Sequence, residues 1–336
     1  MRIPAFCTAV IGLLIATGVG AAAATSAAAQ SITIIREDWQ DAKRDRTVPV
    51  KIYLPAGAGP FPVVIHSHGL GGTREASSVI LTPLAETGFV VVTLQHPGSD
   101  ISIRTPAVMA EMAAGRVPVS GETAVKRYGD ALFAMRELAR RNAAEGPLKG
   151  KLNMQKIGMS GHSFGALGTL VALGESVPMA PPGAFRVPGL AAGIVYSPNK
   201  PRREPAQTAF KAIKVPVLHF TGTEDRTPMD AEATPWERTI PFQNISGSDQ
   251  FLLVVNGGDH QLFSGRRTAE GRAKPGDAVP LQTITDETIR FWRAYLKDDK
   301  KAATELCALP ARDAGVGAAY VKAARCGTPT PIRPAP

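Results

Sequence analysis

Residues 156–168, KIGMSGHSFGALG, are the most informative stretch of this chain about its fold. Residues 156–160 read as a strand, and the sequence GHSFG at 161–165 lies where that strand ends and a helix begins. Only glycine fits beside so tight a turn without a Cβ clash, and the turn lifts the central hydroxyl above the sheet edge. We therefore predict that Ser163 is a nucleophile on a strand-to-helix turn. A glycine-rich turn with an incidental serine is the alternative.

Short β-rich runs alternate with helical stretches on both sides of this turn. We expect strands at residues 32–35, 48–54, 61–67, 89–94, 192–196, 215–220 and 251–255, and helices at 77–86, 124–144 and 285–296. This alternation is typical of a mostly parallel sheet with helices on both faces. The predicted fold class is α/β.

The chain is long enough for one large domain. It has 336 residues, of which 44% are hydrophobic, so it can bury a full core. We expect the domain to span residues 30–309. Residues 310–336 are rich in Pro, Ala and Gly, and we expect a partly disordered tail there.

Residues 1–29 have the pattern of a signal peptide. Arg2 precedes an apolar run at 5–19, and three alanines end at Ala29 before Gln30. We predict cleavage before Gln30 and export to the periplasm or the medium. An uncleaved membrane anchor is the alternative, although the run is short for a spanning helix. We expect no membrane span after signal removal.

Charge and cysteine content narrow the remaining possibilities. The net charge is +9, but the basic residues are scattered, which argues against nucleic-acid binding. His66 and His68 could form a metal pair, yet no further cluster completes a site, so we predict neither metal nor cofactor. Cys307 and Cys326 remain after signal removal and form either a disulfide or two buried thiols.

A nucleophilic serine needs a base and an orienting acid. Of the six histidines, only His260 follows every acid candidate in the order Ser, acid, His, and His162 is expected to point away. Asp225 follows a predicted strand and is our choice of acid. Glu224 is the first alternative, and Asp230 and Asp259 are further candidates.

Acyl transfer also needs amide donors for the oxyanion of the tetrahedral intermediate. The residue after the nucleophile, Phe164, offers one backbone amide. Leu70 offers the other, from the glycine-containing sequence HSHGLGG at 66–72 that follows the third strand. We predict an oxyanion hole formed by these two amides.

The motifs SHGLG at 67–71 and GHSFG at 161–165 resemble the α/β-hydrolase superfamily, in its platelet-activating-factor acetylhydrolase and dienelactone-hydrolase-like branch. The likeness runs from about residue 50 to 296. It implies the α/β-hydrolase fold, with Ser163 as nucleophile, His260 as base, and Leu70 and Phe164 as oxyanion-hole residues.

This chain departs from the branch at two points. Dienelactone hydrolases use cysteine where this chain has Ser163. The acetylhydrolases place their acid one strand earlier, where residues 196–199 here contain no carboxylate. The resemblance therefore implies an esterase-like or lipase-like enzyme without naming a phospholipid substrate.

The most direct functional hypothesis is a serine carboxylic-ester hydrolase that acts through an acyl-enzyme on a small-molecule or lipid-like ester. Met229, Trp236 and Phe263 are candidate apolar walls of its pocket. The alternatives are an exported binding protein that keeps the fold without turnover, and a peptidase. The oligomeric state is not specified by these residues.

Overall fold

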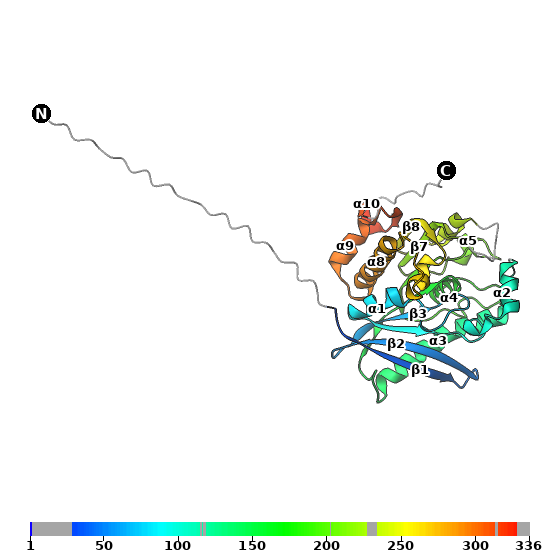
Figure 1. Ribbon diagram of the computed structural model, residues 1–336. Helices are drawn as coiled ribbons and strands as arrows, with labels where there is room; N and C mark the ends of the chain where they lie inside the picture. The colour runs from blue at the N-terminus through cyan, green and yellow to red at the C-terminus, as the bar shows by residue number, and fades with distance from the viewer. Residues whose placement is uncertain are drawn as a thin grey trace.

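A nine-stranded sheet forms the centre of the molecule (Figure 1). The computed structural model describes residues 1, 29–114, 116, 119–201, 203–226, 234–312 and 315–327. The strands are β1 (Ile32–Asp41), β2 (Arg46–Pro55), β3 (Phe61–Ser67), β4 (Val90–Leu94), β5 (Leu152–His162), β6 (Leu190–Tyr196), β7 (Val217–Glu224), β8 (Gln250–Asp259) and β9 (Gly317–Lys322).

The strand order is β1-β2-β4-β3-β5-β6-β7-β8-β9. From β4 to β8 all neighbours pair in parallel, whereas β1, β2 and β9 pair antiparallel at the two ends of the order. The predicted class, a mostly parallel α/β sheet, is confirmed. Parallel strands bring their carboxyl ends to one edge, which collects the loops after β3, β5, β7 and β8.

The described helices of at least eight residues are α1 (Ser78–Glu86), α2 (Pro106–Ala113), α3 (Gly121–Ala143), α4 (Phe164–Leu173), α8 (Ala278–Leu296) and α9 (Lys300–Cys307). Shorter ones are α5 (Ala206–Ala209), α6 (Ile240–Asn244), α7 (Arg266–Ala269) and α10 (Leu309–Arg312). None of the helices in these ranges is long and apolar enough to cross a bilayer.

Helices cover both faces of the sheet because successive strand residues point to opposite sides. Val63 and Ile65 of β3 belong to the apolar cluster that includes residues of α3 and α4, while Val64 between them belongs to the cluster that includes residues of α1, α8 and α9. All three valine and isoleucine side chains are fully buried. This two-sided burial explains why the central strands are continuous apolar runs.

The carboxyl-terminal segment is part of the folded unit. We expected a tail from residue 310, but β9 pairs with β8 along its whole length, and Cys326 is bonded to Cys307 of α9. The predicted boundary at residue 309 therefore lies inside the domain. The sequence is compatible with either a disulfide or two thiols at these cysteines, and the structure has the disulfide. The two cysteines are 19 residues apart in the sequence, and a disulfide that closes a loop of this length stabilises a fold by about 3 kcal/mol.

Several predicted regions lie wholly or largely outside the described residues. They include the signal peptide, apart from its first and last residues, and the end of the chain after residue 327.

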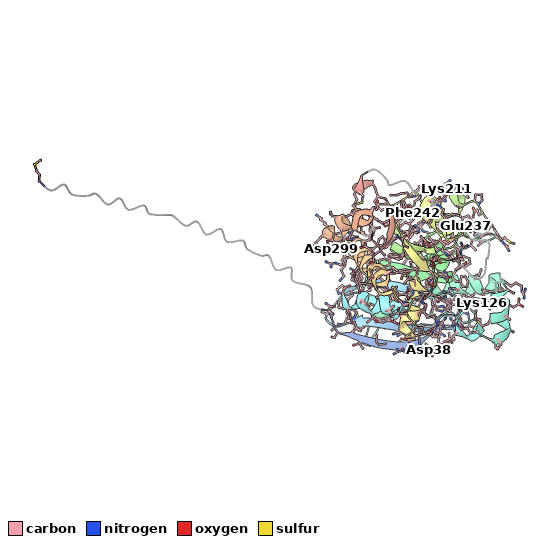
Figure 2. The ribbon with its side chains drawn as sticks, turned by 45° about the horizontal axis from the view of Figure 1, so that its top comes forward. Asp38, Lys126, Lys211, Glu237, Phe242 and Asp299 are labelled. Carbon is pink, nitrogen blue, oxygen red and sulfur yellow. A yellow bond between two sulfur atoms is a disulfide. The ribbon has the colours of Figure 1, made fainter. Side chains whose placement is uncertain are left out.

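Charged side chains are spread over the molecule, as Asp38, Lys126, Lys211 and Asp299 illustrate on its different sides (Figure 2).

Candidate active site

Ser163 occupies the turn between β5 and α4. Its φ of 56° and ψ of −114° are rare for a residue with a side chain, and such strain is typical of functional turns. The turn is held by the Ser163 amide, which donates to the Tyr196 carbonyl at 2.9 Å. A Cβ at Gly161 would overlap the Gly165 carbonyl, and one at Gly165 would overlap the Ser67 carbonyl. Both glycines are therefore required for this turn.

The structure brings Ser163, His260 and Asp225 into one chain of hydrogen bonds. The serine Oγ lies 2.9 Å from His260 Nε2, and His260 Nδ1 lies 2.8 Å from Asp225 Oδ1. The residues lie after β5, β8 and β7, at the same edge of the sheet. Asp225 is fully buried, whereas 12% of the His260 side chain is exposed. The arrangement can remove the serine proton and pass it to a leaving group.

Asp225 is held as a carboxylate. Burial by itself raises the pKa of this group, but the hydrogen bond from His260 and the positive charge of Arg238 outweigh that effect, so the pKa lies below its ordinary value of 3.8. Arg238 Nε lies 2.8 Å from Oδ1, and Thr221 Oγ1 donates to Oδ2 at 2.9 Å. The carboxylate is therefore ionised and directed at the imidazole.

The other acid candidates are placed elsewhere. Glu224 is exposed at the end of β7. Asp259 is paired with Arg267 at 2.6 Å and with Lys274 at 2.7 Å. Asp230 lies outside the described residues. Of the described candidates, only Asp225 bonds His260.

Residues 37–125 match the family "Platelet-activating factor acetylhydrolase, isoform II". No curated protein matches the chain. Together with the order of the strands, the match shows the α/β-hydrolase fold. The match supports the acetylhydrolase branch of that superfamily and a hydrolase acting on esters.

The matched segment includes the glycine-containing loop after β3 but none of Ser163, Asp225 and His260. In the loop, the Gly69 carbonyl accepts from His68 Nδ1 at 2.6 Å and from the Gly72 amide at 3.0 Å. Because a peptide group is planar, these two bonds also set the direction of the Leu70 amide.

The loop lies against the nucleophile. A Cβ at Gly69 would stand 3.4 Å from the Ser163 Cβ and 2.9 Å from His162 Nδ1. On the other side, Phe164 is the first residue of α4, a position whose amide has no acceptor within the helix. The amide segments of Leu70 and Phe164 thus flank the same serine.

The tautomer of His68 follows from its two partners. Nδ1 faces the Gly69 carbonyl and must donate, and Nε2 accepts from the His96 amide at 3.1 Å. Burial lowers the pKa of His68 well below 6.5, which keeps the ring neutral and suited to this pair of bonds. His68 therefore holds the loop and is not available as a base.

The prediction that His162 points away from the site is wrong. Its Nε2 lies 2.9 Å from the His260 carbonyl, and the two imidazole rings are 4.7 Å apart between centroids. Burial lowers the pKa of His162 well below 6.5, so the ring is neutral and donates this bond. His162 supports the backbone of His260, a role that the position within GHSFG does not reveal.

The remaining histidines are buried with polar partners. His66 Nδ1 lies 2.9 Å from Ser160 Oγ, His96 lies between Ser67 and Asp130, and His219 Nε2 lies 2.8 Å from Gln250 Oε1. His66 and His68 bond different groups, the Ser160 hydroxyl and the Gly69 carbonyl. In the described ranges no group of three or more His, Cys, Asp or Glu side chains could hold a metal.

The two candidate pocket walls that the structure describes, Trp236 and Phe263, lie in different apolar clusters. Phe263 is fully buried in the core and offers no surface to a substrate, so that prediction is wrong. Trp236 is half-buried against a small cluster that includes Phe242 and Tyr320. Met229 lies outside the described residues.

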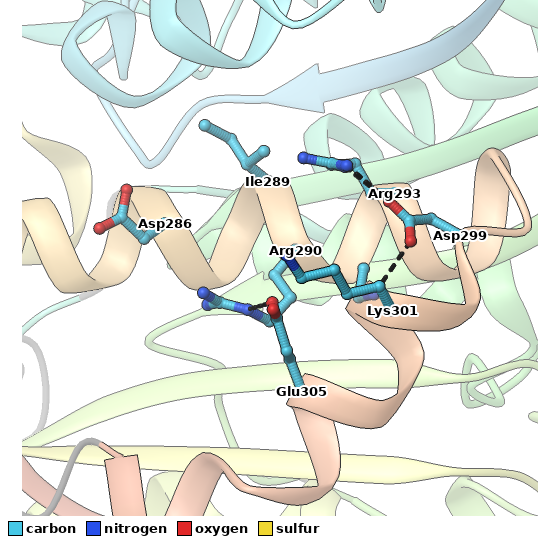
Figure 3. A pocket seen from close by; sticks show the side chains of 8 residues that line it. Asp286, Ile289, Arg290, Arg293, Asp299, Lys301 and Glu305 are labelled. Carbon is cyan, nitrogen blue, oxygen red and sulfur yellow. Dashed lines mark hydrogen bonds and ion pairs between the residues drawn. The ribbon is translucent and has the colours of Figure 1, made fainter. Parts of the chain in front are cut away.

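A cavity of about 200 Å³ between α8 and α9 belongs to a different region (Figure 3). Its charged walls form ion pairs with each other, Arg290 with Glu305 at 2.8 Å and Arg293 with Asp299 at 2.7 Å. None of the residues that line it belongs to the site described above.

Two arginines near the site were missed by sequence reasoning. Arg238 bonds the Asp225 carboxylate and also donates to the carbonyls of Ser197 at 3.1 Å and Pro198 at 3.2 Å. It thereby ties the acid to the loop after β6, the place where the acetylhydrolase branch was expected to carry its acid. Arg127 of α3 bonds Ser67 and the His68 carbonyl, at the start of the loop after β3. No local motif marks either residue.

Proposed function

We propose that this chain is an exported serine hydrolase that cleaves a carboxylic ester through an acyl-enzyme. One observation carries the proposal: a strained serine, a histidine and a buried carboxylate joined by hydrogen bonds of 2.9 and 2.8 Å. Simple packing does not require a left-handed serine at this turn. The family match, which indicates a hydrolase acting on esters, agrees with this chemistry.

The proposed reaction has two halves. Ser163 Oγ attacks the ester carbonyl carbon while its proton passes to His260 Nε2. Asp225 stabilises the imidazolium, and the amides of Leu70 and Phe164 donate to the oxyanion. The alcohol leaves with the proton from Nε2. Water then attacks the acyl-enzyme by the same path, with His260 again as base, and releases the acid.

The proposed substrate is a small-molecule or lipid-like ester. The acetylhydrolase match favours a lipid-like ester within this class. The proposed mechanism uses no metal or cofactor, because serine, imidazole and amide groups supply every proton transfer and hydrogen bond. A panel of p-nitrophenyl esters of increasing acyl length would measure the preferred chain length.

Export is the second part of the proposal. The Cys307–Cys326 disulfide supports it, since disulfides persist in oxidising compartments. Expression of the full chain, followed by cell fractionation and intact-mass measurement, tests it. We expect an extracytoplasmic product that begins at Gln30; a product that retains residues 1–29 would refute cleavage.

The decisive experiment compares the wild-type protein with Ser163→Ala. We expect wild type to hydrolyse p-nitrophenyl acetate or butyrate and to be labelled at Ser163 by a fluorophosphonate. Ser163→Ala should remain folded by circular dichroism and lose both properties. A folded wild type that shows neither hydrolysis nor labelling would instead support the non-catalytic binding protein.

A further inference from the structure

Arg127 is a buried charge next to the proposed oxyanion hole. It lies on α3 and only 2% of its surface is exposed. Burial lowers its pKa to about 9, so it remains charged at neutral pH. A buried charge costs several kcal/mol unless its surroundings compensate it. The position of this guanidinium therefore calls for a physical reason.

The guanidinium contacts the loop after β3 at two points. Nη2 donates to Ser67 Oγ at 3.0 Å and to the His68 carbonyl. Nη1 donates to Ser99 Oγ at 3.1 Å, and the Ser99 carbonyl in turn accepts from the Gly71 amide at 2.9 Å. Arg127 thus holds the loop on both sides of Leu70.

The same guanidinium also contacts the other half of the hole. Its Cζ lies 4.6 Å from the centroid of the Phe164 ring, a distance suited to a cation–π interaction. Phe164 directly follows the nucleophile, and its amide is the second proposed donor. One side chain therefore touches two segments that are far apart in sequence and that each supply one amide.

From these contacts we infer that Arg127 is a positioning residue of the oxyanion hole, which sets the Leu70 amide relative to the Phe164 amide. This inference rests on the proposed function. A planar group with several donors can bond a carbonyl and two hydroxyls while lying over a ring, whereas the ammonium of lysine cannot do all of these at once. Removing Arg127 should leave Ser163, His260 and Asp225 joined but misalign the donors.

The test uses Arg127→Met and Arg127→Lys in the full chain. Arg141→Met is the matched control, because Arg141 lies on the same helix with its guanidinium 5.0 Å from the centroid of the Trp39 ring, and it contacts neither loop nor nucleophile. Each variant is assayed after its folded, active fraction has been titrated with a fluorophosphonate.

We expect Arg127→Met to lower kcat by roughly 10- to 100-fold, which is no more than the loss in kcat caused by removing one oxyanion-hole donor. KM should stay within about threefold of the wild-type value. Arg127→Lys should recover part of this loss. Arg141→Met should keep kcat within about twofold. Phe164→Leu keeps the backbone amide but removes the ring, so its kcat should lie between those of wild type and Arg127→Met.

A second readout separates alignment from general damage. Sulfur is a weak hydrogen-bond acceptor, so an oxyanion hole accelerates an ester more than the corresponding thionoester. The ester-to-thionoester rate ratio should fall in both Arg127 variants and stay unchanged in Arg141→Met. This ratio compares two substrates on one preparation, so partial unfolding does not move it.

Two results would overturn the inference, and they are distinguishable. If wild type is active and labelled at Ser163 but the Arg127 variants keep both kcat and the rate ratio, the positioning role alone fails. If wild type itself is inactive and unlabelled, the proposed function fails and this inference fails with it.

Discussion

Two places in this molecule carry the same four residue types in the same order of contact. In the outer constellation, Ser163, His260, Asp225 and Arg238, the serine-to-histidine and histidine-to-aspartate distances are 2.9 and 2.8 Å. In the inner constellation, Ser67, His96, Asp130 and Arg46, they are 3.0 and 2.9 Å. Hydrogen-bond geometry alone does not distinguish them.

The two constellations differ in their exposure to solvent and in the groups that surround them. The His96 side chain is 1% exposed and His260 is 12% exposed. Ser67 ends a strand and receives a hydrogen bond from Arg127, whereas Ser163 stands on a strained turn beside the loop of Leu70. A serine, a histidine and an aspartate in contact therefore form a structural network when substrate cannot reach them. We interpret the inner constellation as the foundation of the loop after β3.

Substitution of the two serines should give the largest difference in activity. Ser163→Ala should reduce kcat/KM by about 10⁶-fold, because the attacking atom is lost. Ser67→Ala should stay within about tenfold of wild type and lower stability by about 1 to 3 kcal/mol, because its buried hydrogen bonds with His96 and Arg127 are lost. Ester kinetics and urea unfolding measure the two effects. Residual Ser163→Ala activity that disappears on adding Ser67→Ala would show that the inner serine is reactive.

The aspartates should separate activity from stability. Asp225→Asn should lower kcat by roughly 10⁴-fold, because the imidazole loses its charged partner and its tautomer. Asp130→Asn should instead lower the free energy of unfolding by about 3 to 5 kcal/mol, since Arg44 and Arg46 would lose a buried counter-charge. Kinetics and denaturant unfolding of both variants check this, and equal effects on kcat would contradict it.

The arginines should show a smaller contrast in the same direction. Arg238→Met should lower kcat by about 10-fold and raise the pKa of Asp225, so that activity is lost at a higher pH on acidification. Arg46→Met should reduce stability and leave the pH profile of kcat unchanged. Matching pH profiles of Arg238→Met and wild type would argue against an electrostatic role for Arg238.

Acid should weaken the fold through the buried histidines. Burial lowers the pKa of His96 to about 4 and those of His66 and His219 to about 3. The unfolded chain binds protons at these rings near pH 6.5, and the folded chain does so only near those lower values, so stability falls as pH drops from about 6.5 towards 4. The limit is about 1.4 kcal/mol per pH unit for each ring.

We therefore expect Tm to fall by about 5 °C or more between pH 7.5 and 5.0 in calorimetry or fluorescence melts. Below pH 4, protonation of low-pKa carboxylates such as Asp130 adds a loss of the same sign. A Tm that is constant or rises over the first interval would contradict the buried, neutral state of these rings.

Local sequence patterns predicted much of this fold. The apolar runs at β3 and β4 marked buried strands because both faces of the sheet are covered there. β9 was missed, because Gly317–Lys322 is short and alanine-containing and becomes a strand only by pairing with β8. Phe263 was misplaced as a pocket wall, since its exposure depends on neighbours that the sequence does not specify.

The mostly parallel sheet, the tight turn at Ser163 and the order of serine, acid and histidine along the chain could all be predicted from the sequence. These depend on strand periodicity, glycine sterics and chain order, all of which are local. Three features became visible only in the folded chain. They are the histidine that supports His260, the arginine that bonds Asp225, and the buried network of Ser67, His96 and Asp130 that repeats the contacts of the site. Such pairings depend on distances between elements remote in sequence, and these distances are set by packing.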